Sequence, residues 1–194
     1  MRLSGNFSLD EFLVSQTAER KGGEILQHQM NPPQQVIDNM QYLVDETVQP
    51  LRTLLGVPMK ISSGYRCEEL NTAIGGSNRS QHVHGQAADI ILSDRMIYEL
   101  ASERTRRVIE NKGREIIRQS WRPGINANFY LFAVTCMYLD DLDVDQVIHE
   151  YGTPGEPAWV HVSASRERNR RQILRIDRDG SKELTLEEAL ALGG

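Results

Sequence analysis

The first third of the chain carries apolar residues at helical spacing. Between Asn31 and Gly56 they recur every three or four positions, as in a helix that buries one face. Asn31-Pro32-Pro33 is a typical helix start and Gly56 a typical helix end. Pro50 lies inside this segment and predicts a kink, because proline lacks the N–H group that a helix needs. Ser8-Leu9-Asp10-Glu11 has the spacing of a capping box and predicts a shorter helix there.

Short apolar runs bounded by glycine and polar residues predict strands. They lie at Met59–Ser63, Ala87–Leu92, Gln146–Tyr151 and Trp159–Ser163. The last two are joined by residues 152–157, which contain two glycines and two prolines, so we expect a hairpin.

The remaining segments favour helices. We expect a brief helix that ends at Gly75-Gly76, and one that runs from Ser93 to about Lys112. Asn128–Leu139 is apolar throughout, so it fits either a helix or a strand, and its length favours a helix. Residues 166–176 are highly charged and are also predicted to be helical.

These elements predict an α+β fold, with a small, mostly antiparallel sheet packed against helices. The change to a charged segment after Ser165 suggests a division into a domain of residues 1–165 and a C-terminal segment of residues 166–194.

Charge and composition narrow the possible partners. The 194 residues include 27 acidic and 22 basic residues, so the net charge is −5, and we expect no nucleic-acid partner. No apolar run approaches the roughly 20 residues that cross a bilayer, so we expect no membrane insertion. The start has no apolar segment of a secretory signal, which predicts synthesis in the cytoplasm. Two cysteines, Cys67 and Cys136, are too few for a disulfide scaffold. We expect a monomer.

One segment, Ser80 to Asp89, carries the chemistry of a metal site. His82 and Asp89 lie seven residues apart, with small residues between them, and His161 lies inside a predicted strand. Imidazole and carboxylate groups both bind zinc, and three protein ligands with one open position are typical of catalytic zinc. Taken singly, each of these residues also fits a buried structural role.

Several motifs occur together in a characteristic order. They are Ser62-Ser63-Gly64-Tyr65-Arg66, Leu70-Asn71, Gly75-Gly76, the His82–Asp89 segment, and Trp159–Ser163. Over residues 5 to 165 this order resembles the zinc D-Ala-D-Ala carboxypeptidase family, which includes phage L-alanyl-D-glutamate endolysins and is related in structure to the hedgehog signalling domain. The resemblance implies zinc ligation by His82, Asp89 and His161.

The resemblance also suggests residues that bind substrate. Arg66 matches an arginine that relatives place beside the substrate carbonyl or carboxylate, where a fixed cation steadies an oxyanion. Ser80 resembles a serine near the metal, and it also fits a turn or cap. His84 forms an H-x-H pair with His82, so a strand would place both on one face, although the family ligand is His82.

The general base departs from the family pattern. Many relatives carry an acidic residue three positions before the last zinc histidine, and this chain has Ala158 there. Glu150 is the favoured replacement, because the predicted hairpin pairs its strand with that of His161, and because Asp145–Glu150 resembles a segment of a phage-rich branch. Glu156 in the hairpin loop is the alternative, and Glu150 also fits a solvated strand-end charge.

The C-terminal segment resembles an EF-hand calcium loop. Its predicted oxygen ligands are Asp177, Asp179, Ser181, Glu183 through its backbone, Thr185 and Glu188. Lys182 occupies the position that normally needs glycine, so weak affinity is expected. Because the loop follows the strand of His161, calcium binding is a hypothetical switch for the zinc site.

The sequence thus predicts a zinc-dependent hydrolase of peptidoglycan stem peptides. We expect a phage endolysin that cuts between L-Ala and D-Glu, is released from the host cytoplasm and lyses the cell by acting on the wall in the periplasm. A D-Ala-D-Ala carboxypeptidase and a virion-borne wall peptidase are alternatives with the same chemistry. A non-catalytic, metal-stabilised binding module is an alternative of another class.

Overall fold

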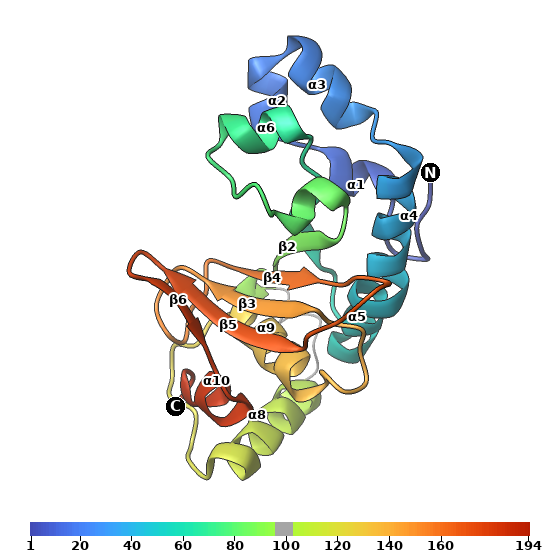
Figure 1. Ribbon diagram of the computed structural model, residues 1–194. Helices are drawn as coiled ribbons and strands as arrows, with labels where there is room; N and C mark the ends of the chain where they lie inside the picture. Colours follow the sequence, from blue (N-terminus) through green and yellow to red (C-terminus); the bar gives the residue numbers. More distant parts are fainter. Residues whose placement is uncertain (96–102) are drawn as a thin grey trace.

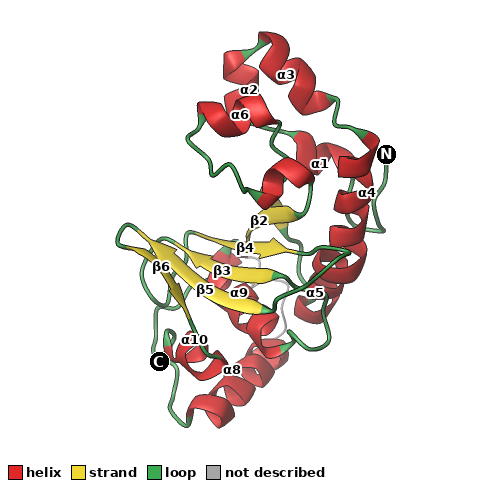
Figure 2. Cartoon of the chain, in the orientation of Figure 1, coloured by secondary structure: helices red, strands yellow, loops and turns green. Residues whose placement is uncertain are grey.

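A computed structural model describes residues 1–95 and 103–194 (Figure 1). The fold is α+β, as predicted: one six-stranded sheet with helices packed against it (Figure 2). The strands are β1 (Lys60–Ser63), β2 (Ala87–Ile91), β3 (Gln146–Glu150), β4 (Trp159–Ser163), β5 (Gln172–Asp177) and β6 (Gly180–Glu183). Their order is β1-β2-β4-β3-β5-β6, and every neighbouring pair is antiparallel except β3 and β5.

The N-terminal half is mainly helical. Its helices are α1 (Leu9–Leu13), α2 (Gln16–Lys21), α3 (Gly23–Met30), α4 (Gln34–Leu43), α5 (Gln49–Leu55) and α6 (Glu68–Ala73). The predicted capping box forms at the start of α1, where Ser8 and Glu11 satisfy each other's backbone N–H groups. Helices α2, α3 and α6 lie together at the top of Figure 1, away from β5 and β6.

The long predicted helix is interrupted where Pro50 requires it. A π-helical turn, η1 (Val44–Val48), joins α4 to α5, and Pro50 lies in the first turn of α5. The wider turn leaves room for the proline ring, which would otherwise meet the preceding turn of the helix. Gly56 ends α5 in the left-handed region with φ 69°, as predicted.

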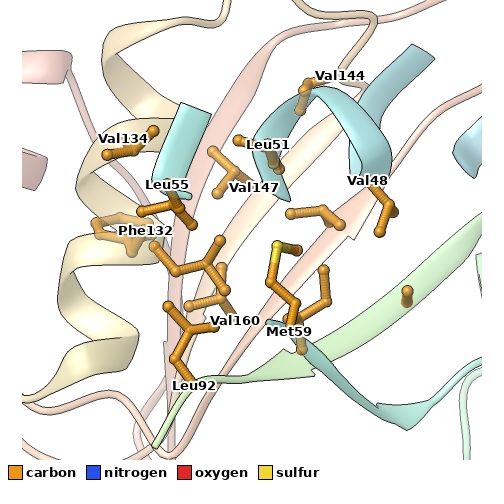
Figure 3. Close-up of a cluster of buried hydrophobic side chains, with 14 of the residues drawn as sticks. Val48, Leu51, Leu55, Met59, Leu92, Phe132, Val134, Val144, Val147 and Val160 are labelled. Atoms are coloured by element: carbon orange, nitrogen blue, oxygen red, sulfur yellow. The ribbon is translucent and has the colours of Figure 1, made fainter. Parts of the chain in front are cut away.

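The hydrophobic core lies between one face of the sheet and the helices. Val147 of β3 and Val160 of β4 point toward Leu51, Leu55 and the apolar helix α9 (Figure 3). Helix α9 (Ala127–Met137) resolves the ambiguous segment as a helix, and ten of its eleven residues are buried. The opposite face of the sheet is therefore free to carry polar side chains.

Among the described residues, the C-terminal half has two further helices. They are α8 (Glu103–Ile117) and α10 (Leu186–Ala191), which contact each other and α9. The helix predicted from Ser93 to about Lys112 includes residues 96–102, which lie outside the described residues, and α8 covers its later part.

The helix predicted for residues 166–176 is wrong. Residues 172–177 form β5, which pairs in parallel with β3, and β6 returns beside it. Ile173 is buried on the core face, whereas Ile176 lines the opposite face, so the apolar residues serve both sides of a strand. The predicted division after Ser165 therefore falls between two strands of the same sheet.

Candidate metal centre

Three elements bring His82, Asp89 and His161 together. His82 lies in the short 3₁₀ helix η2 (Gln81–His84), Asp89 in β2 and His161 in β4. Asp89 and His161 are direct cross-strand partners, so the sheet register places both side chains on the same face. All three are buried, with exposed fractions of 3 to 6%.

The three side chains present their ligand atoms as a small triangle. His161 Nδ1 lies 3.0 Å from Asp89 Oδ1, and His82 Nε2 lies 3.2 Å from each of those atoms. Ligands at about 2.0 Å from zinc in a tetrahedral arrangement would lie about 3.3 Å apart. The donor set and its spacing therefore fit a zinc ion with three protein ligands.

The surroundings orient these donor atoms. His82 Nδ1 lies 2.6 Å from the backbone carbonyl of Gly64, which accepts its proton and leaves Nε2 free to bind a metal. Burial by itself would raise the pKa of Asp89, but the charges and hydrogen bonds of His82 and His161 hold that pKa well below its usual range. Asp89 is therefore anionic at neutral pH, as a carboxylate that binds a metal ion must be.

Arg66 binds the other oxygen of the same carboxylate. Its Nη2 donates to Asp89 Oδ2 at 2.8 Å, and its Nε donates to the Ser63 hydroxyl at 3.0 Å. The Arg66 side chain is 19% exposed and borders the site, so it is a fixed cation beside the metal position.

We call His82, Asp89 and His161 the triad. A groove of about 630 Å³ opens over these residues, and we call it the triad groove. Besides the triad, its polar lining includes Arg66, Arg79, Ser80 and Glu150, so Ser80 lies where the sequence placed it. Ile148, Ile176 and Trp159 supply an apolar floor. The groove gives the triad an open side on which a substrate has access, as a catalytic rather than a structural site requires.

Glu150 lies on the same face of the sheet as His161. Glu150 pairs with Trp159, and the next groove-facing pair along the strands is Ile148 with His161. The indole N–H of Trp159 donates to Glu150 Oε2 at 2.7 Å. Burial, and next the negative charge of Asp89, raises the pKa of Glu150, while His161 and Trp159 oppose that rise. A carboxylate with a raised pKa beside a metal site suits proton transfer.

The competing candidates lie elsewhere. Glu156 is exposed in the hairpin loop, where its carboxylate accepts from the Thr153 hydroxyl at 3.0 Å. His84 is exposed, because residues two apart in the 3₁₀ helix η2 point in different directions. His149 is buried on the core face against Phe132.

The residues of the predicted calcium loop form a hairpin and a helix cap. Arg178 and Asp179 form the turn between β5 and β6, and Gly180 follows them with φ 126°, a backbone conformation that favours glycine. Thr185 caps α10, and Glu188 closes that capping box while it also pairs with Lys182 at 3.0 Å. Among the described residues, only His82, Asp89 and His161 form a metal-type group of histidine, cysteine or acidic side chains. Asp177, Asp179, Ser181, Glu183, Thr185 and Glu188 keep their calcium role as a prediction from sequence.

The Asp145 side chain links Arg170 of the C-terminal segment to Gln81, which precedes His82. Its carboxylate accepts from Gln81, the neighbour of His82, at 2.8 Å, and from the backbone and side chain of Arg170. This link could not be predicted from the sequence, because the partners are far apart along the chain.

Comparison with known proteins agrees with this geometry. The family model for peptidase M15, a family of zinc-dependent peptidases, matches residues 5–120, which include His82 and Asp89. No curated protein matches the chain. No helix among the described residues has the length and apolar character to cross a membrane.

Proposed function

Because the chain belongs to the peptidase M15 family, we propose that it hydrolyses peptide bonds in the stem peptides of bacterial peptidoglycan. The observation that carries this proposal is the buried triangle of His82, Asp89 and His161, which opens on one side into the triad groove. A zinc ion held by these residues would polarise the substrate carbonyl and lower the pKa of a water molecule toward about 7.

The protein's own side chains supply the remaining chemistry. Glu150 takes the proton of the attacking water and passes it to the leaving amine. Its hydrogen bond from Trp159 fixes the carboxylate, and its raised pKa makes it a better proton acceptor than an ordinary glutamate. Glu150 rather than Glu156 takes this role, because Glu150 lines the groove and Glu156 is held in the exposed loop.

Arg66 stabilises negative charge on the substrate. The oxyanion of the tetrahedral intermediate, or a substrate carboxylate, would lie beside its guanidinium. The contact with Asp89 keeps this cation in place before substrate arrives, so little reorganisation is needed during the reaction. Ser80 offers a hydroxyl to the same groove.

The finer proposal is a phage endolysin that cuts between L-Ala and D-Glu. It rests on the resemblance of the Asp145–Glu150 segment to a phage-rich branch of the family, and it includes action as a monomer on the wall after release from the cytoplasm. Calcium control of the activity remains a sequence-based part of the proposal. A D-Ala-D-Ala carboxypeptidase, a virion-borne wall peptidase and a non-catalytic binding module are the alternatives.

Digestion of purified peptidoglycan tests the proposal. The zinc-loaded protein should release new amino termini, and their identity assigns the bond: D-Glu for the endopeptidase, free D-Ala for the carboxypeptidase. The protein stripped of zinc should release neither. A zinc-loaded, folded protein that binds peptidoglycan but yields no new amino termini would support the binding module instead.

A further inference from the structure

A second groove adjoins the triad groove at Arg66. It has a volume of about 540 Å³ and lies between β1 and the segment from Val14 to Arg20. Arg66 and Ile74 line both grooves, so the two grooves adjoin at these side chains.

The second groove has a cationic lining, and we call this groove the cationic groove. Arg20, Lys60 and Arg66 line it together with the hydroxyl groups of Ser15, Thr17, Ser62 and Ser63. No aspartate or glutamate is among its described lining residues. Because the whole chain carries a net charge of −5, this local excess of positive charge is opposite to that of the protein.

The two outer cations have no acidic partner in the described parts of the chain. Arg20 donates a hydrogen bond to the Thr17 hydroxyl at 3.1 Å, and Lys60 is exposed at the start of β1. Arg66, in contrast, is already paired with Asp89. Arg20 and Lys60 are therefore the lining cations that remain available to an anion from outside.

The sheet geometry sets the distance from the metal site. Ser63 pairs with Asp89, and Lys60 pairs with Ile91, because a bulge between Ile61 and Ser63 takes up one residue of β1. Lys60 therefore lies two register positions, about 7 Å, from Asp89 along the strand. An extended peptide covers about 3.3 Å per residue, so a peptide that runs along β1 would place its second residue beside Lys60. Strand β1 is an edge of the sheet, with β2 as its neighbour, so its outer side is open to such a ligand.

We propose that the cationic groove is a subsite for a substrate carboxylate about two residues from the cleaved bond, recognised by Arg20 and Lys60. The inference rests on the proposed peptidase function and names a specificity determinant of the same site. A peptide carboxylate is favoured over other anions, because the groove adjoins the triad groove at Arg66 and Ile74 and its edge strand suits an extended chain.

A pair of synthetic peptide substrates tests the subsite. They are identical except that one has a carboxylate and the other a carboxamide at the second residue from the cleaved bond. For the Arg20→Gln/Lys60→Gln variant, kcat/KM should fall about five- to tenfold on the carboxylate peptide, mainly through KM, as the loss of two exposed charge contacts predicts. The carboxamide peptide should be cleaved at an unchanged rate.

Lys21→Gln is the matched control, because Lys21 is an exposed cation on the same helix that does not line the groove. It should leave both peptides unaffected, while zinc content and melting temperature should be the same in all variants. An equal loss on both peptides, or no loss on either, would overturn the subsite.

Calorimetric binding separates this inference from the proposed function. If the zinc-loaded protein cleaves neither peptide, the peptidase proposal fails, but the affinities still test the groove. Tighter binding of the carboxylate peptide, lost in the double variant and weakened by salt, supports the subsite. Equal affinities for the two peptides would refute it.

Discussion

Trp159 donates its indole N–H to Glu150 across the β3–β4 pair, at 2.7 Å. The contact joins the strand that carries the third triad residue to the strand that carries the proposed base. Since Trp159 lies two residues before His161, one stretch of β4 positions both a proposed metal ligand and the proposed proton acceptor. Trp159 is thus a positioning residue for Glu150.

Replacing Trp159 by Phe tests that role. The hydrogen bond favours the ionised carboxylate, so its loss should raise the pKa of Glu150. The acid limb of the pH profile of kcat/KM should move to higher pH, and kcat at neutral pH should fall about tenfold. Zinc content should not change. A lower rate with an unshifted pH profile would mean that Trp159 acts only through packing.

Glu150→Gln should remove the general base and keep the shape of the side chain. We expect kcat to fall by about 10²- to 10⁴-fold, with bound zinc and melting temperature retained. Glu156→Gln is the control, because Glu156 lies nearby in the hairpin loop but does not line the triad groove. The reverse result, with a large loss only for Glu156→Gln, would transfer the role of base to the loop.

The ligand set can be checked without any substrate. His82→Ala should lower bound zinc from about one ion per chain to near zero, because two protein ligands hold the metal poorly. His84→Ala should bind zinc like the unmodified protein, since His84 is exposed and outside the triad. Metal analysis of the purified variants gives the answer, and equal losses in both would contradict the assignment.

Asp145 should contribute to stability in a pH-dependent way. Burial would raise its pKa, but hydrogen bonds from Arg170 and Gln81 lower it below the usual value. A carboxylate with a lowered folded pKa stabilises the fold above its unfolded pKa of about 3.9, and that contribution is lost as the pH falls through the folded pKa.

The variant Asp145→Asn should therefore lower the free energy of unfolding by about 1–3 kcal/mol at pH 7. The difference between variant and unmodified protein should shrink below about pH 4. Thermal unfolding across this pH range measures it, and a difference that does not change with pH would show that charge is not the cause.

The calcium hypothesis predicts that calcium raises the melting temperature of the protein, and that Asp179→Asn removes the effect. Glu188 forms the capping box of α10 and an ion pair with Lys182, so calcium binding by Glu188 must displace those contacts. Melting curves of the zinc-loaded protein with calcium and with a calcium-selective chelator test this prediction. Identical curves would exclude a calcium site that stabilises the fold.

Local signals predicted most of the fold. A few neighbouring residues specify each of four features: the helix start at Ser8, the helix end at Gly56, the interruption at the proline, and the hairpin between β3 and β4. These features could therefore be predicted from the sequence. The segment from Gln172 to Asp177 could not, because it becomes a strand through parallel pairing with β3, a partner that is distant along the chain.

In the candidate site, too, some features could be predicted from the sequence and others could not. Its ligand types followed from residue chemistry and family resemblance, and the hairpin register predicted that Glu150 and His161 would share a face. The Gly64 carbonyl behind His82, the Trp159 contact with Glu150 and the Asp145 link to Gln81 depend on tertiary geometry. Nothing in the local sequence indicates these contacts.

The Asp89 carboxylate has one oxygen in the triad and the other on Arg66. Whatever occupies the first oxygen alters the charge that the second presents to the guanidinium. Metal uptake and recognition at Arg66 are therefore reciprocally coupled: a ligand that engages Arg66 must change the affinity for the ion by the same factor by which the ion changes the affinity for that ligand. Because both events involve the Asp89 carboxylate, binding of the metal ion and binding of a ligand at Arg66 are linked equilibria.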